Sequence, residues 1–130
     1  MITKHRPLLT RHPNRKLRKP KKHPERDLQE KCVYYVRKNH KNWLVFSVPN
    51  EFARGEAPEA RRMGMLKGAS DLIVVKPDQI FFIEFKSDIG TQTVEQKRFE
   101  AKVQKNGFNY YIIRDFNTFK NVVNGTCKSL

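Results

Sequence analysis

The chain has 130 residues, of which 38% are hydrophobic, so it is long enough for one domain with a modest core and too short for two. Its 27 Lys and Arg against 13 Asp and Glu give a net charge of +14, which indicates that the binding partner is a polyanion. No apolar run reaches the roughly 18 residues that a membrane span needs, so a membrane span is excluded and nucleic acid is the favoured partner. Two cysteines, Cys32 and Cys127, are too few for a disulfide framework, and the amino-terminal segment lacks the apolar stretch of a secretory signal, so we expect a protein of the reducing cytoplasm.

Residues 1–24 form a basic arm. They contain nine Lys and Arg, three His, four Pro and no acidic residue. A segment of this composition cannot bury enough apolar surface to fold alone, so we expect the arm to be disordered when free. Either it contacts phosphates or it is only a solvated tail. Residues 25–130 then form the single folded domain, whose 18 basic and 13 acidic residues leave it at +5.

The folded part begins with a helix and a strand. Pro24 suits the first turn of a helix, and apolar side chains recur at helical spacing after it, which predicts a helix over 24–39. Residues 43–48 (WLVFSV) are rich in strand formers and precede Pro49, so we expect a short, mostly buried strand. The charged stretch 51–63 is predicted to be a loop with one or two helical turns.

An antiparallel hairpin is predicted next. Residues 71–75 (DLIVV) and 80–85 (IFFIEF) have the composition of strands, and residues 76–79 (KPDQ) have that of a turn. If Val75 pairs with Ile80, the two runs form a hairpin, and this pairing defines which residues of the two strands face each other.

The last elements alternate between helix and strand. Apolar spacing over 93–106, with Gly107 placed to end the helix, predicts a helix there. Residues 110–113 (YYII) predict a strand, and a final helix is expected near 116–123. The whole order predicts an α/β domain in which helices cover a mixed sheet that includes the hairpin.

Two acidic residues face each other in the predicted hairpin. Counting back from the pairing of Val75 with Ile80 puts Asp71 opposite Glu84, and side chains so paired have Cβ atoms about 4.5 to 5.5 Å apart. Two carboxylates at that distance repel unless a positive group lies between them, which makes a divalent cation the natural occupant. A register shift of one residue would break this pairing.

Lys86 is predicted to lie beside the same pair. Strand alternation sends Glu84 and Lys86 to one face, while Ile83 and Phe85 point to the core. A cation held by carboxylates can polarise a phosphodiester and activate water, and an ammonium group can stabilise the developing charge. The structural alternative is that Asp71 caps a turn and that the Glu84–Lys86 pair is an exposed pair at a strand end.

Three short motifs, in order and at their spacing, resemble the VRR-NUC family of the PD-(D/E)XK nuclease superfamily. They are residues 64–72 (GMLKGASDL), 83–86 (IEFK) and 93–96 (TVEQ). The resemblance reaches back to Glu25-x-x-x-Gln29 and to Val48-Pro49-Asn50, and so covers nearly all of residues 25–123. The sequence departs from the usual Pro-Asp by having Ser70 before Asp71.

The resemblance implies a PD-(D/E)XK-like core and a metal-dependent, structure-selective endonuclease. Asp71 and Glu84 would bind one or two Mg or Mn ions, and Lys86 would be the catalytic lysine. Glu25 matches the acid of the first helix that often completes such a site, with Glu30 as a substitute. Gln96 either belongs to the catalytic site or only closes a helix capping box with Thr93.

Four further residues are candidates for contact with the substrate. Gln29 lies one turn after Glu25 on the same face of the first helix. Gly68 would let DNA approach the backbone closely, although it could equally be a turn residue. Asn50 and Arg54 would touch DNA, although an ordinary polar loop explains them as well.

The sequence therefore predicts a Mg- or Mn-dependent hydrolase of DNA phosphodiester bonds, acting on branched or junction DNA. One active site cuts one strand, so symmetric resolution of a four-way junction would need a homodimer. The first alternative is a non-catalytic nucleic-acid-binding protein with the same fold and arm. The second is a basic RNA-binding or ribosome-associated protein, for which the facing carboxylates would have no purpose.

Overall fold

A four-stranded mixed sheet lies at the centre of the domain, in a computed structural model that describes residues 22–49 and 57–125. In spatial order its strands are β1 (Leu44–Ser47), β2 (Leu72–Lys76), β3 (Gln79–Phe85) and β4 (Asn109–Ile113). The first three are antiparallel neighbours, whereas β3 and β4 are parallel. The parallel pair requires a crossover between β3 and β4, and this crossover contains a helix.

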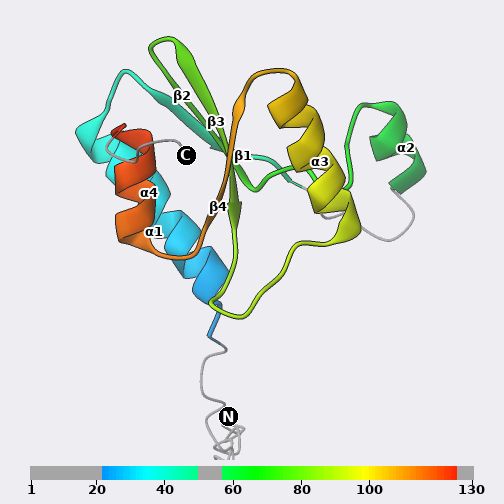
Figure 1. The fold of residues 1–130 in the computed structure, drawn as a ribbon, viewed down its shortest axis with the longest axis horizontal. Helices are drawn as coiled ribbons and strands as arrows, with labels where there is room; N and C mark the ends of the chain where they lie inside the picture. Colours follow the sequence, from blue (N-terminus) through cyan, green and yellow to red (C-terminus); the bar gives the residue numbers. More distant parts are fainter. Residues whose placement is uncertain (1–21, 50–56, 126–130) are drawn as a thin grey trace, which may run out of the picture.

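Four helices occur in the described part of the chain. They are α1 (Pro24–Asn39), α2 (Ala57–Arg62), α3 (Val94–Lys105) and α4 (Phe116–Val123). Figure 1 shows α1 and α4 together on one side of the sheet and α3 on the other. The main core lies between the sheet and the α1–α4 pair, and its buried side chains include Cys32, Leu72, Val74, Ile83, Phe85, Ile113 and Phe119.

The ends of α3 and α4 are determined by local sequence. Thr93 caps α3, since its hydroxyl accepts a hydrogen bond from the backbone N–H of Gln96, and the Gln96 side chain bonds back to Thr93. Gly107, just after α3, has φ of 84°, a conformation that glycine adopts without strain. Asp115 caps α4 by accepting a hydrogen bond from the Thr118 N–H.

Most of the predicted elements are confirmed. The helices at 24–39 and 116–123 have the predicted bounds, and the helix predicted over 93–106 is α3 with its caps. In the hairpin Val75 pairs with Ile80, as predicted. The stretch 51–63 contains the short helix α2, and its residues up to 56 lie outside the described part of the chain.

The prediction that the strand at 43–48 is mostly buried is wrong. Leu44 and Phe46 of β1 are 62% and 46% exposed. The reason is that β1 lies at the edge of the sheet, next to β2 alone, so one apolar side chain in two faces water. An apolar run reads the same in an edge strand as in a central one.

No helix in residues 22–49 and 57–125 is long and apolar enough to cross a membrane. The basic arm lies almost wholly outside the described residues, so its predicted disorder stays a prediction. The first described helix, α1, begins at Pro24, and the division of the chain into an arm and a domain stays a prediction.

Candidate active site

Asp71 and Glu84 lie at the same end of the hairpin. Leu72, the first residue of β2, pairs with Ile83, and the same register continued by one residue places Asp71 opposite Glu84. Ile83 and Phe85, the neighbours of Glu84 in β3, are buried in the core, so alternation turns Glu84 to the opposite face of the sheet. The hairpin thus brings the two predicted carboxylates together.

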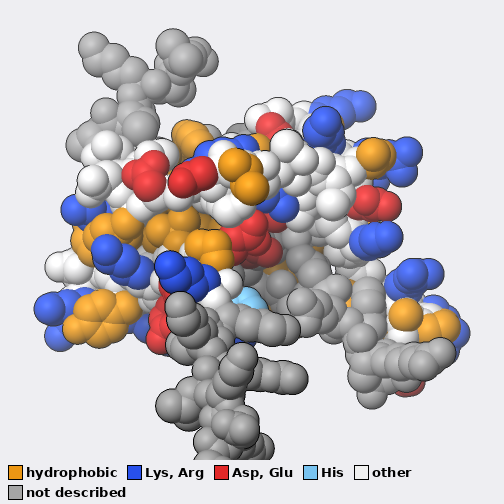
Figure 2. Space-filling model, turned by 90° about the horizontal axis from the view of Figure 1, so that it is seen from below, with side chains coloured by type: hydrophobic (Ala, Val, Ile, Leu, Met, Phe, Trp, Pro, Cys, Tyr) orange, Lys and Arg blue, Asp and Glu red, His pale blue; other side chains and the backbone are white. Residues whose placement is uncertain are grey.

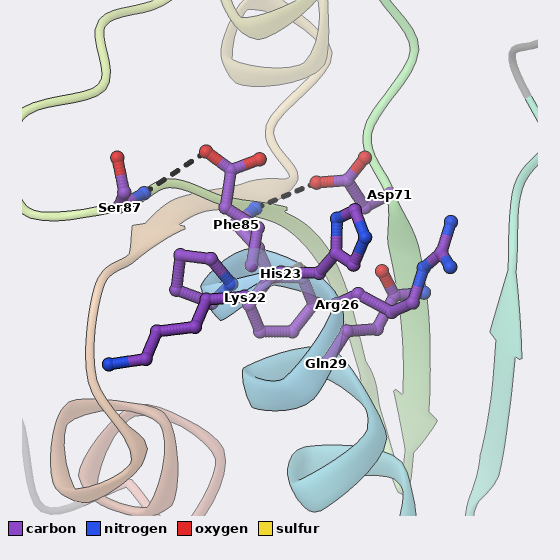
Figure 3. A pocket seen from close by; sticks show the side chains of 9 residues that line it. Lys22, His23, Arg26, Gln29, Asp71, Phe85 and Ser87 are labelled. Carbon is purple, nitrogen blue, oxygen red and sulfur yellow. Dashed lines mark hydrogen bonds between the residues drawn. The ribbon is translucent and has the colours of Figure 1, made fainter. Parts of the chain in front are cut away.

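Each carboxylate is held by the protein around it. Oδ2 of Asp71 accepts a hydrogen bond of 2.8 Å from the backbone N–H of Phe85 (Figure 3). Oε1 of Glu84 accepts one of 2.7 Å from Nε2 of Gln96 and lies 3.4 Å from Nζ of Lys86. Lys86 therefore flanks the pair, as strand alternation predicts.

Glu84 is only 1% exposed, which is unusual for an acidic residue. Burial, together with the charge of Asp71, raises the pKa of Glu84 to about 7. Burial also raises the pKa of Asp71, although the Phe85 N–H and the charge of Lys86 oppose the shift. Two negative charges are therefore unfavourable here without a further positive group, which is the electrostatic condition for a cation site.

The donor atoms fit a hard divalent cation. Oε2 of Glu84 and Oγ of Ser70 are buried and have no hydrogen-bond partner among the described residues. Both oxygens belong to neighbours of Asp71, one across the hairpin and one along the chain. Carboxylate oxygens are the ligands that Mg and Mn prefer, so Asp71 and Oε2 of Glu84 could hold such an ion.

Glu25 lies near this pair, but its carboxylate is hydrogen-bonded to the segment after β3. Within the described residues no group of three or more His, Cys, Asp and Glu side chains is arranged to hold a metal. Oε1 of Glu25 instead accepts a hydrogen bond of 3.1 Å from the Ser87 N–H (Figure 3). Glu25 is near enough for its charge to raise the pKa of Asp71, so its role as a third ligand stays a prediction.

An open groove of about 450 Å³ leads to Asp71. Its walls come from the start of α1, including Glu25 and Gln29, and from Ser87 after β3 (Figure 3). The groove is also lined by three basic residues that the sequence motifs did not single out, namely Lys22, His23 and Arg26. Arg26 lies three residues before Gln29 and therefore on the same face of the helix, so the sequence could have identified Arg26 from this spacing.

Gln96 closes the capping box and also contacts Glu84, while its catalytic role stays a prediction. Its Oε1 accepts the Thr93 N–H at 2.9 Å, which closes the capping box, and its Nε2 donates to Glu84. One side chain thus joins the start of α3 to the buried carboxylate.

The remaining predicted site residues are less closely associated with the pair. Gly68 has φ of 87°, and a Cβ atom there would collide with the backbone of Glu95 in α3, so close packing alone requires glycine. Glu30 lines a neighbouring groove along α1 that does not include Asp71. Asn50 and Arg54 lie outside the described residues.

Comparison with known proteins gives a likeness of structure. No family model and no curated protein matches the sequence. A solved structure described as a VRR_NUC domain protein matches with a TM-score of 0.65 and 19% identity, over 81% of this chain and 88% of that one. Another, described as a VRR_NUC domain, matches with a TM-score of 0.57 and 20% identity, over 79% of this chain and 97% of that one. The described sheet and helices of this chain therefore have the fold of a VRR_NUC domain.

Proposed function

We propose that the protein is a metal-dependent nuclease that hydrolyses DNA phosphodiester bonds. The observation that carries the proposal is the carboxylate pair of half-buried Asp71, which lines an open groove, and buried Glu84, whose Oε1 lies 3.4 Å from Nζ of Lys86. The likeness to VRR_NUC domains supports the same chemistry. The excess of basic residues supports a nucleic-acid substrate, and Figure 2 shows Lys and Arg side chains on the same face as the acidic ones.

Asp71, Glu84, Lys86 and Gln96 each have a role in such a reaction. An Mg or Mn ion bound by Asp71 and Glu84 would neutralise charge on the phosphate and activate water. The ammonium group of Lys86 would stabilise the negative charge that develops on the phosphate oxygens. Gln96 keeps Glu84 oriented by a hydrogen bond, so that Oε2 remains directed away from it and free for the ion.

The substrate groove favours recognition of DNA shape over recognition of sequence. Its basic lining residues Lys22 and Arg26 are suited to phosphates, which carry no sequence information. We therefore propose a structure-selective endonuclease, with branched or junction DNA as substrate. Symmetric cutting of a four-way junction would require a homodimer, which sedimentation at assay concentrations tests.

A second candidate, a DNA-binding protein without catalysis, is favoured by one specific observation. Oε1 of Glu84 already accepts a hydrogen bond from Gln96 and forms an ion pair with Lys86, as in an ion pair that serves only the fold. In that case Lys86 would compensate the charge of Glu84 within the fold and no metal would bind.

A cleavage assay separates the two candidates. Labelled duplex, nicked, flap and four-way DNA would be incubated with Mg, with Mn and with chelator. We expect cutting only with metal, and its loss in Glu84→Gln and Lys86→Ala while DNA binding stays within a few-fold of wild type. Asp78→Asn and Lys97→Ala, exposed residues outside the groove, are the matched controls. Normal cutting by Glu84→Gln would show that the site is misassigned.

A further inference from the structure

The segment that follows Lys86 is a tight turn clamped by a charged side chain from a distant segment. Within the turn, the N–H of Gly90 donates to the carbonyl of Ser87 at 3.2 Å. Nη1 of Arg114, which lies just after β4, donates to the carbonyls of Ser87 and Gly90 at 2.6 and 2.8 Å. Arg114 thus bonds to both ends of the turn.

A second charged residue holds the same turn from the other side. Glu25 of α1 accepts the N–H of Ser87, and the N–H of Lys86 donates to the carbonyl of Ile113 at 3.1 Å. Residue 90 has little room for a side chain, because a Cβ atom there would lie 3.1 Å from Oγ of Ser87 and 3.4 Å from Cδ of Lys86. The backbone of residues 87–90 is therefore held by α1, by β4 and by its own turn.

Ile89 projects from this clamped turn with 92% of its surface exposed. Single exposed apolar residues are common and by themselves indicate nothing. Ile89 differs because hydrogen bonds hold the turn on both sides of it, at Ser87 and at Gly90, and because it lies three residues beyond Lys86. It borders a hollow of about 560 Å³ that Lys86 and Arg114 also line, together with Leu28 and the acidic Asp88.

We propose that Ile89 is a wedge that inserts between bases of DNA at a nick, branch or end. The proposal rests on the nuclease function proposed above and specifies its substrate as DNA with an interrupted base stack. An apolar side chain that enters a base step must unstack it, which is unfavourable in intact duplex. The cost is smaller where the stack is already interrupted, so a rigid wedge beside Lys86 selects such DNA.

The test measures base unstacking without any cleavage. Nicked DNA with 2-aminopurine beside the nick is bound by the full chain in chelator, and 2-aminopurine fluorescence reports the loss of stacking. We expect wild type to raise the fluorescence on nicked DNA and to leave it low on intact duplex. Ile89→Ser should abolish most of the rise and reduce the preference for nicked over intact DNA by about tenfold. Ile89→Leu should retain both.

Leu44→Ser is the matched control, because Leu44 is an exposed aliphatic residue on β1 that lines neither groove. It should behave as wild type. Arg114→Gln removes the clamp and keeps Ile89, and it should lower the fluorescence rise. An unchanged rise would show that the wedge does not depend on the clamped turn.

The two proposals fail separately. If Ile89→Ser gives the same fluorescence and the same preference as wild type, the wedge is refuted even where the protein cuts DNA. If wild type never cuts with Mg or Mn but Ile89→Ser loses the fluorescence rise, the nuclease function is refuted and the DNA-binding wedge stands.

Discussion

Gln96 bridges the start of α3 and the buried Glu84, donating from Nε2 to Oε1 over 2.7 Å while its own Oε1 accepts the N–H of Thr93. Because both polar atoms of the side chain are used, the capping of a helix and the orientation of a candidate ligand depend on one residue. Stability and activity can therefore be separated by comparing Gln96 with its capping partner.

Thr93→Ala and Gln96→Ala should differ in activity more than in stability. Thr93→Ala removes one cap hydrogen bond and should reduce the free energy of unfolding by about 1 kcal/mol with little loss of cleavage. Gln96→Ala also releases Glu84 and should lower cleavage by roughly tenfold or more. Urea unfolding and single-turnover cleavage measure the two effects. Equal activity in the two variants would leave Gln96 as a cap only.

Without metal, the protein should lose stability as pH rises from about 4.5 to about 7. The pKa of Glu84 is raised from 4.5 to about 7, so over this range the folded protein keeps a proton that the unfolded chain has lost. The raised pKa of Asp71 acts in the same direction. Urea unfolding in chelator at several pH values measures the slope, which Glu84→Gln should flatten. A wild-type slope no steeper than that of Glu84→Gln would contradict the raised pKa.

Manganese should stabilise wild type and should stabilise Asp71→Asn much less. A ligand that binds only the folded state adds about 2.7 kcal/mol at a hundredfold excess over Kd. The asparagine keeps the shape of Asp71 and an oxygen for the Phe85 N–H, but it removes one charge from the pair. Thermal melts with chelator and with Mn measure the gain, and Asp78→Asn is the control. Equal gains in all three proteins would mean that the ion binds elsewhere.

Gly68→Ala should destabilise the fold more than Gly64→Ala. Both glycines have positive φ, so alanine is strained at each by about 1 to 2 kcal/mol. At Gly64 the new methyl group meets open space, whereas at Gly68 it collides with the backbone of Glu95, one residue before Gln96. Thermal melts of the two variants measure the difference. Similar melting temperatures would show that α3 shifts easily to admit the new methyl group. Gly68 would then again be a candidate for contact with DNA.

Deleting residues 1–21 should weaken DNA binding and flatten its dependence on salt. These residues carry eight Lys and Arg and no acid, and the log-log slope should fall by about 0.9 for each phosphate of duplex DNA that the shortened protein no longer neutralises. Fluorescence anisotropy across a salt series measures the slope. An unchanged slope would identify the arm as a solvated tail.

The sequence by itself determined the elements whose signals are local. The helix at 24–39 follows from Pro24 and the apolar spacing after it, and the helix at 93–106 follows from its caps. The pairing of Val75 with Ile80 was predictable because a short turn joins the two strands, and that register alone implied that Asp71 faces Glu84.

The tertiary structure decided what depends on contacts between distant segments. The exposure of β1 follows from its position at the sheet edge, which no feature of its six-residue apolar run encodes. Glu25 was placed on the correct helix, but its bond to Ser87, 62 residues away, could be known only once α1 lay beside the end of β3. The clamp of Arg114 on the turn that carries Ile89 likewise needs the parallel pairing of β3 with β4, because this pairing brings residues 86 and 113 side by side.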